Sequence, residues 1–210
     1  MIKETILKFK TWALAALFLS SPGLVVAQPH PLQSYINGLQ SFSANFVQER
    51  EEDHFFRVER AKGTFDLVRP GKMRWDYHEP DEQHIVVDGR HLWVYDLELQ
   101  QVSVRPVSEI QGDIPLAWLL FDEPIEQSYK IIDVGQRDGL TWYNLQPKDA
   151  TFFQSIEIGL KDDEMREVWM YQSSDNVTKV KFSQVRINQP ISPRAFNFTP
   201  PQGTDLVGEM

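Results

Sequence analysis

The chain has 210 residues, with 30 acidic side chains against 21 basic ones, and it contains no cysteine. The formal net charge of −9 argues against nucleic acid or an anionic membrane surface as a partner, because like charges repel at long range. The lack of cysteine excludes disulfides, and it excludes a lipid-modified cysteine at a mature N-terminus.

The first residues have the features of a secretory signal peptide. Three lysines precede an apolar run, Trp12–Leu19, that is too short to span a bilayer. Val25 and Ala27 suit cleavage by a signal peptidase. We therefore expect a signal peptide over residues 1–27 and a single soluble periplasmic domain over residues 28–210. A membrane anchor that is never removed is the alternative.

The mature chain is expected to begin with a short helix. Leu32, Ile36 and Leu39 recur at helical spacing and predict one buried face. The period then changes from near four to two, because apolar and polar residues alternate over Phe42–Val47. This second pattern is typical of a half-buried strand.

Alternation with a period of two recurs almost to the end of the chain. Phe65 and Leu67 share one face of an expected strand, and Met73 and Trp75 share one face of the next. Two Asp-Gly pairs between strands favour tight antiparallel hairpins. Further strands are expected at Ile85–Val87, Leu92–Tyr95, Gln101–Arg105, Ile131–Val134, Leu140–Leu145, Ser155–Leu160, Glu167–Gln172, Lys179–Ile187 and Ala195–Thr199.

One later stretch, Ile114–Phe121, interrupts this period. Asp113 can cap the start of a helix and Pro115 fits its first turn. Because the stretch is apolar on all sides, the helix must be covered on all sides. These patterns predict an α+β fold in which one long antiparallel sheet curls around two short helices and encloses an apolar cavity.

No pattern of catalytic or metal-binding residues emerges. The nearest approach to a ligand cluster is His78 with Glu79, Asp81 and His84, whose spacing favours a solvated loop. Nucleophile elbows, phosphate-binding glycine loops and dinucleotide motifs are missing from the sequence. We therefore expect no enzyme activity, no metal and no cofactor.

The aromatic content of the chain has two interpretations. Five tryptophans follow the expected signal peptide, and large aromatic residues tend to share a strand face. Such residues normally pack into a core. Two short helices offer little volume to fill so broad a sheet, and an unfilled apolar cavity stays dry and accepts hydrocarbon. The pattern alone leaves core and cavity equally open.

Arg69 follows Phe65 and Leu67 on the same face of its expected strand, and Pro70 favours an extended conformation at Arg69. Its guanidinium therefore points where the apolar side chains point. A buried arginine needs acceptors, and the free carbonyls at a helix end can supply them. An arginine that reaches water at the end of the strand is the alternative.

Several runs of residues, in a fixed order, resemble the outer-membrane lipoprotein carrier (LolA) family. The likeness covers essentially all of the chain after the signal peptide. The runs are Phe42–Gln48, Arg69–Tyr77, Pro80-Asp81, Val87–Arg90, Leu92–Asp96 and Phe196–Gly203.

The resemblance implies an open, incomplete antiparallel β-barrel whose apolar concave face is covered by short lid helices. It further implies a monomeric periplasmic chaperone that receives acylated lipoproteins from an inner-membrane ABC transporter complex and passes them to an outer-membrane lipoprotein receptor. By this resemblance Arg69 locks the lid, and Met73 stands where many members have phenylalanine. The expected lipid-cavity residues are Phe65, Leu67, Met73, Trp75, Trp93, Leu116, Trp118 and Leu119.

Two rival functions are weighed against this one. A lipid or lipoprotein sensor could share the half-barrel, whereas the receptor itself would need the cysteine that the chain lacks. A periplasmic β-sandwich enzyme would need a polar cluster in a cleft, and the sequence shows none.

Overall fold

The computed structural model describes residues 29–52, 57–110 and 116–208 of the chain. The predicted signal peptide, residues 1–27, lies outside the described residues. Within the described ranges, no helix combines the length and the apolar character that crossing a membrane requires. The helices are α1 Pro31–Gly38, α2 Val107–Ile110, α3 Ala117–Leu120 and α4 Ile125–Ser128, with a 3-10 turn, η1, at Pro193–Phe196.

The strands of the described chain form one twelve-stranded sheet. In chain order they are β1 Ser41–Glu52, β2 Arg57–Val68, β3 Lys72–Glu79, β4 Gln83–Val87, β5 His91–Asp96, β6 Gln101–Pro106, β7 Tyr129–Arg137, β8 Leu140–Pro147, β9 Ser155–Lys161, β10 Glu164–Tyr171, β11 Asn176–Ile187 and β12 Asp205–Gly208.

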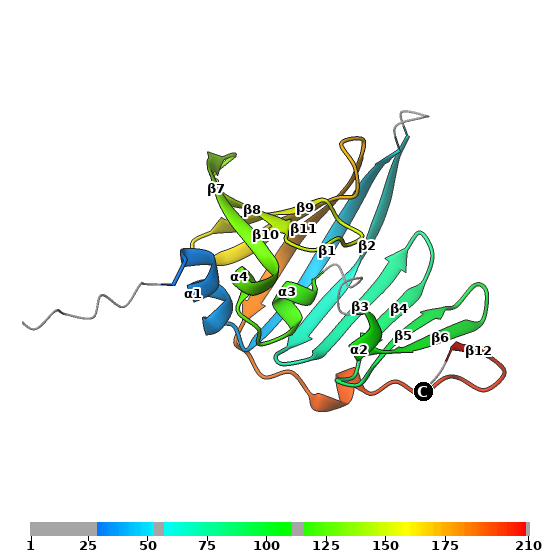
Figure 1. The fold of residues 1–210 in the computed structure, drawn as a ribbon. Helices are drawn as coiled ribbons and strands as arrows, with labels where there is room; N and C mark the ends of the chain where they lie inside the picture. The colour runs from blue at the N-terminus through cyan, green and yellow to red at the C-terminus, as the bar shows by residue number, and fades with distance from the viewer. Residues whose placement is uncertain (1–28, 53–56, 111–115, 209–210) are drawn as a thin grey trace, which may run out of the picture.

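The order of the strands across the sheet is β12-β6-β5-β4-β3-β2-β1-β11-β10-β9-β8-β7. All neighbours pair antiparallel except β12 and β6, which pair parallel. The sheet is curved and stays open between β7 and β12, with α1, α3 and α4 lying within its curve (Figure 1). The predicted α+β fold with an open antiparallel sheet is therefore confirmed.

The two faces of the sheet carry separate apolar clusters. The larger cluster lies on the concave side, where Phe65 and Leu67 of β2 pair with Trp75 and Met73 of β3. The smaller cluster lies on the outer side of β4, β5 and β6. Successive side chains of a strand point to opposite faces, so a strand that is apolar throughout contributes to both clusters.

Backbone conformation at the turns fixes several hairpins. Asp138 and Gly139 have positive φ values of 54° and 76°, as a type I′ turn requires, and they join β7 to β8. Asp162 and Asp163 join β9 to β10 in the same way, with φ values of 51° and 58°. The sequence patterns identified the first of these turns and missed the second, because it contains no glycine.

The C-terminal segment differs from its prediction. The strand expected at Ala195–Thr199 is wrong: Pro193–Phe196 form the 3-10 turn, and Phe198 packs on Trp93 of the outer cluster. Two prolines, at 200 and 201, have no N–H to donate to a neighbouring strand, so a ladder cannot continue there. The last strand is β12, which pairs with β6.

Candidate functional site

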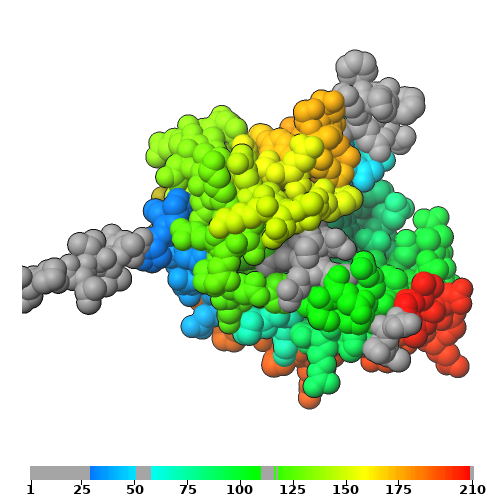
Figure 2. Space-filling model, in the orientation of Figure 1, coloured from blue at the N-terminus to red at the C-terminus, as the bar shows by residue number. Residues whose placement is uncertain are grey.

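The concave face is covered by α1, α3 and α4. Leu32 and Ile36 of α1, Leu119 and Leu120 of α3, and Ile125 of α4 are all buried in the concave cluster. In the space-filling view, α1 (blue) adjoins the yellow-green segment around α4 (Figure 2). The helices therefore form a layer over the apolar side of the sheet.

A buried side chain links two of these helices to each other. The side-chain oxygen Oε1 of Gln33, in α1, accepts a hydrogen bond from the backbone N–H of Ile125, in α4, at 2.7 Å. Gln33 is itself buried and also donates to Asn37 at 2.7 Å. Because this bond is shielded from water, it holds α1 to α4 more firmly than an exposed bond would.

The predicted second helix is shorter than expected. Its described part is α3, a single turn at Ala117–Leu120, and Phe121 lies beyond the end of the turn. Residues 114 and 115 lie outside the described residues. A helix of one turn has no intrahelical partner for most of its carbonyl groups, so these need donors from elsewhere.

Arg69 supplies such donors from the end of β2. Its Nη1 donates to the carbonyl oxygen of Leu39 at 3.3 Å and to that of Ile36, and its Nη2 donates to the carbonyl oxygen of Phe121 at 2.8 Å. Nη2 also lies 3.1 Å from the carboxylate of Asp122. The end of one strand is thus tied both to α1 and to the segment that follows α3.

Burial of Arg69 is nearly complete, because its side chain is only 7% exposed. This burial lowers the pKa of Arg69 from its usual value, and the negative charge of Asp122 opposes that effect. A second bond reinforces the contact, since the backbone N–H of Gly71 donates to the carbonyl of Leu120 at 2.9 Å. The helix-end carbonyls predicted as acceptors for Arg69 are therefore the ones that it contacts.

Seven of the eight expected lipid-cavity residues lie together in the concave cluster. Each of them is at most 5% exposed. They are Phe65, Leu67, Met73, Trp75, Leu116, Trp118 and Leu119. Leu116, Trp118 and Leu119 belong to the α3 segment itself, whereas the helices cover the four residues on β2 and β3. Hydrocarbon can reach those four only if the helices move aside.

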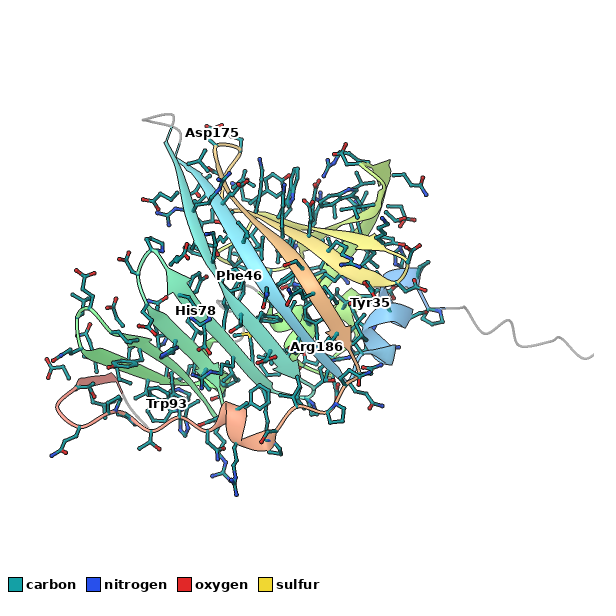
Figure 3. The ribbon with its side chains drawn as sticks, turned by 180° about the vertical axis from the view of Figure 1, so that it is seen from behind. Tyr35, Phe46, His78, Trp93, Asp175 and Arg186 are labelled. Carbon is teal, nitrogen blue, oxygen red and sulfur yellow. The ribbon has the colours of Figure 1, made fainter. Side chains whose placement is uncertain are left out.

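Trp93 is the exception, and its assignment to the cavity is wrong. It lies in the outer cluster with Val86 and Val104, near the C-terminal segment (Figure 3). Its indole N–H donates to Asp88 Oδ2 at 2.9 Å. In the register of the sheet Trp93 pairs with Val86, whereas Val87 faces the concave cluster. Alternation along β5 therefore turns Trp93 outward.

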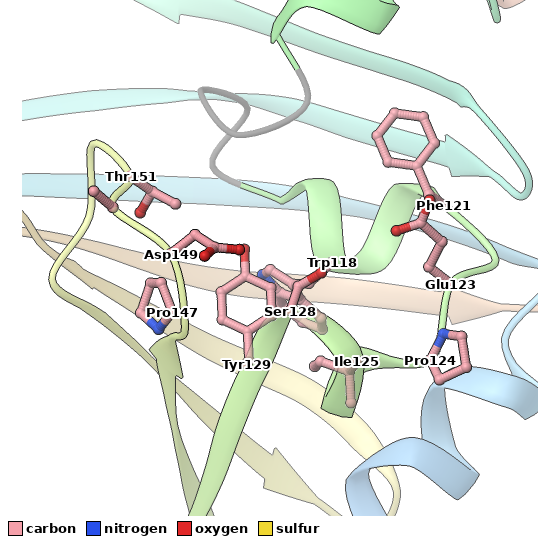
Figure 4. Close-up of a pocket in the computed structure, with 11 residues that line it drawn as sticks. Trp118, Phe121, Glu123, Pro124, Ile125, Ser128, Tyr129, Pro147, Asp149 and Thr151 are labelled. Carbon is pink, nitrogen blue, oxygen red and sulfur yellow. The ribbon is translucent and has the colours of Figure 1, made fainter.

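A pocket of about 250 Å³ opens at the edge of the helical layer. It lies between α3, α4 and the connection from β8 to β9 (Figure 4). The lining residues are Trp118, Phe121, Glu123, Pro124, Ile125, Ser128, Tyr129, Pro147, Asp149, Ala150 and Thr151. Most of them come from loops, so no periodic pattern in the sequence signalled the pocket. Trp118 and Ile125 belong to both the pocket and the concave cluster.

Two indole groups in the concave cluster lack hydrogen-bond partners. Within the described part of the chain, the indole Nε1 atoms of Trp75 and Trp118 are buried without a hydrogen-bond acceptor. Trp75 packs between the rings of Phe46, Phe65 and Tyr77. The concave interior thus offers hydrogen-bond donors in an apolar setting.

The histidine cluster noted in the sequence is dispersed over the outer surface. His84 bonds to Asp76 through Nδ1 at 2.8 Å, and Nε2 of His78 lies 3.5 Å from the Thr64 hydroxyl. Over residues 29–52, 57–110 and 116–208, no three histidine, aspartate or glutamate side chains converge as metal ligands would. His84 is instead hydrogen-bonded to Asp76, which also forms an ion pair with Arg74.

Comparisons with known proteins agree with this architecture. Residues 37–199 match the family model described as outer membrane lipoprotein carrier protein LolA. An outer-membrane lipoprotein carrier protein from Methylobacillus flagellatus is 34% identical over 203 residues, which cover 91% of this chain and 99% of that protein. One from Chromobacterium violaceum is 37% identical, over 84% of this chain and 85% of that protein.

A solved structure shares the fold at low sequence identity. It is an uncharacterized conserved protein from Thermus thermophilus, 11% identical, with a TM-score of 0.53 over 85% of this chain and 99% of that one. The family match covers most of the described chain, and the sequence relatives align over nearly their whole length. The chain belongs to the outer membrane lipoprotein carrier protein LolA family.

Proposed function

We propose that this protein is a periplasmic carrier that holds the acyl chains of lipoproteins against its concave apolar face. The proposal includes removal of residues 1–27 and a single carrier domain over residues 28–210. The observation that carries it is a broad apolar face covered by short helices that one buried arginine ties down. The names of the relatives supply the cargo class, because they are lipoprotein carriers.

The energetics of the cargo explain why a movable cover is useful. Burying hydrocarbon stabilises by about 0.8 kcal/mol per methylene, so acyl chains taken from water would bind almost irreversibly. Their starting point is a membrane, where they are already buried. A carrier must therefore roughly match the bilayer and then release its cargo. A face that is covered in the empty state lowers the net affinity by the free energy needed to uncover it.

Arg69 is suited to set that free energy. Each charge-assisted hydrogen bond contributes about 1.5 to 3 kcal/mol, and Arg69 donates to Ile36, Leu39 and Phe121. Opening the cover breaks these bonds but also exposes the guanidinium to water. Hydration of the guanidinium then offsets part of the free energy of opening. The closed form is then favoured without being permanent, as a carrier requires.

The partners follow from the family and not from any contact in this structure. We propose that an inner-membrane ABC transporter complex loads the carrier and that an outer-membrane lipoprotein receptor unloads it. A monomer suffices for this cycle, since one concave face with its own cover forms the whole site. No enzyme activity is part of the proposal.

Replacement of Arg69 by leucine tests the role of the lock. Leucine keeps part of the apolar stem of the arginine, so folding should persist, while the donors to the helix ends are lost. We expect an acylated lipoprotein to bind at least roughly 10-fold more tightly and to pass to receptor-containing membranes more slowly. The measurement is transfer of a purified lipoprotein from the carrier to the receptor.

Arg60→Leu is a matched control for this substitution. Arg60 lies on the same strand, but its guanidinium is at the surface and pairs with Glu49 at 2.7 Å. This variant should bind and release cargo as the unmodified protein does. Unchanged binding and transfer in Arg69→Leu would refute the assignment of Arg69, whereas absence of lipoprotein binding by the unmodified protein would refute the carrier function.

A further inference from the structure

Trp118 lines the pocket at the edge of the helical layer and carries a polar group, its indole N–H. The residue is 5% exposed, and its indole N–H has no acceptor within the described part of the chain. Trp118 lines the pocket together with Ser128 and Tyr129 (Figure 4). A buried N–H that is left unpaired destabilises the structure, so a ligand that offers an acceptor there gains affinity.

The other buried orphan atoms that face the concave cluster are donors too. They are Nε1 of Trp75, Nε of Arg69 and the hydroxyl of Tyr35, which can also accept. The outer indoles are different, because Trp142 donates to a backbone carbonyl and Trp169 donates to Glu167. The concave side therefore has donors in excess, and its complement is a group that accepts hydrogen bonds and donates none.

The surroundings of the pocket select a neutral acceptor. Glu123 and Asp149 line the pocket, and both residues are exposed. Their negative charges disfavour the carboxylate of a free fatty acid. An acyl ester carries carbonyl oxygens, has no N–H or O–H and bears no charge.

The size of the pocket limits how much of a lipid it holds. Its volume of about 250 Å³ is below the roughly 300 to 1,000 Å³ that is usual for sites enclosing a whole ligand. Trp118 lies at the inner wall, where the pocket meets the concave cluster. The pocket thus fits the ester end of an acyl chain, with the hydrocarbon continuing beneath α3 and α4 once these helices move.

We propose that the indole N–H of Trp118 donates a hydrogen bond to the ester carbonyl of a bound acyl chain. The inference rests on the proposed carrier function and adds the chemical group that the protein recognises at the mouth of its site. It makes the carrier selective for ester-linked chains over chains of equal length that lack the carbonyl.

The test compares two synthetic lipopeptides that differ only in linkage. One carries two hexadecanoyl chains as esters on a glyceryl thioether of its N-terminal cysteine, and the other carries two hexadecyl chains as ethers. Dissociation constants are measured by competition against a fluorescent lipopeptide for the unmodified protein, for Trp118→Phe and for Trp169→Phe. Phenylalanine retains an aromatic ring and removes the N–H. Trp169 is the control because its indole donates outside the concave face.

The unmodified protein and Trp169→Phe should bind the ester about 5-fold more tightly than the ether, as expected for one hydrogen bond. In Trp118→Phe the two should bind equally, with the affinity for the ether unchanged, which also shows that the variant is folded. A preference that survives in Trp118→Phe, or one absent from the unmodified protein, overturns the inference while leaving the carrier function standing. If neither lipopeptide binds the unmodified protein, the carrier function fails and the inference with it.

Discussion

Trp142 and Trp169, on the outer face of β8 and β10, differ from Trp75 and Trp118 on the concave side in what their indole groups contact. The outer pair is fully partnered: Trp142 donates to the carbonyl of Arg137 at 3.0 Å, and Trp169 donates to Glu167 at 2.9 Å. The concave pair has no acceptor within the described residues. Tryptophans on the outer face thus have hydrogen-bonded indole groups, whereas those on the concave face do not.

The cationic side chains on the two faces also differ in what they contact. The guanidinium of Arg137 lies 4.3 Å from the ring centroid of Trp142 and 4.6 Å from that of Trp169, and the ammonium group of Lys179 lies 4.9 Å from the latter. These cation–π contacts hold the outer layer together. On the concave side the buried cation is Arg69, which contacts helix ends instead of rings. The outer face is thus held by fixed contacts, whereas under the proposed function the inner face is uncovered when cargo binds.

A single added methyl group should destabilise the protein more on the concave face than on the outer face. A Cβ at Gly63 would lie 1.8 Å from the carbonyl oxygen of Asp76, a backbone atom that cannot retreat. A Cβ at Gly159 would meet side chains, Leu140 at 2.9 Å and Trp142 at 3.0 Å. We expect Gly63→Ala to cost more than about 3 kcal/mol of unfolding free energy and Gly159→Ala about 1 to 2 kcal/mol. Urea titration measures both, and an equal or larger cost at Gly159 would contradict this ranking.

Alkaline pH should weaken the concave side through its tyrosines. Burial raises the pKa of Tyr77 to about 12 and that of Tyr35 to about 12. Since an unfolded tyrosine titrates near 10, the unfolded state loses its proton first, and stability falls between about pH 10 and 12 by up to about 3 kcal/mol per residue. Tyr77→Phe should lessen that fall in pH-dependent unfolding. A variant that retains the full fall would show that Tyr77 is not shielded as described.

A smaller difference in stability is expected between variants that remove one indole from each face. Trp142→Phe and Trp75→Phe remove a similar volume from sites that are 1% and 4% exposed. Only the first also breaks a hydrogen bond, the one that Trp142 donates to the carbonyl of Arg137. We expect Trp142→Phe to be the more destabilising by about 1 kcal/mol. Equal costs in thermal or urea unfolding would indicate that the Trp75 N–H has a partner.

The sheet could be predicted from sequence because most of its strands are polar on one face. Phe65 and Leu67 alternate with polar neighbours, so their face, and hence that of Arg69, follows from counting along β2. Trp93 could not be placed in this way. Its strand is apolar at both Leu92 and Val94 as well, and alternation then gives no preference for either face.

Other features depend on contacts between distant parts of the chain. The pairing of β12 with β6 joins residues about a hundred positions apart and runs parallel, which no local pattern encodes. The pocket beside Trp118 combines α4 with the loop that follows Pro147, and its lining shows no periodicity. By contrast, the acceptors of Arg69 were predictable in kind, since any short helix leaves carbonyls free at its end.

The most direct test of the account is whether the helical cover moves when an acyl chain binds. The natural chain has no cysteine, so spin labels can be placed at Glu126 of α4 and Lys181 of β11, both of which are exposed. Pulsed dipolar spectroscopy then measures the distance between them with and without the ester-linked lipopeptide. We predict a longer and broader distance distribution when the lipopeptide is bound, and a similar shift in Arg69→Leu without it. A distance distribution that stays the same while the lipopeptide is bound would contradict a helical cover that moves aside for cargo.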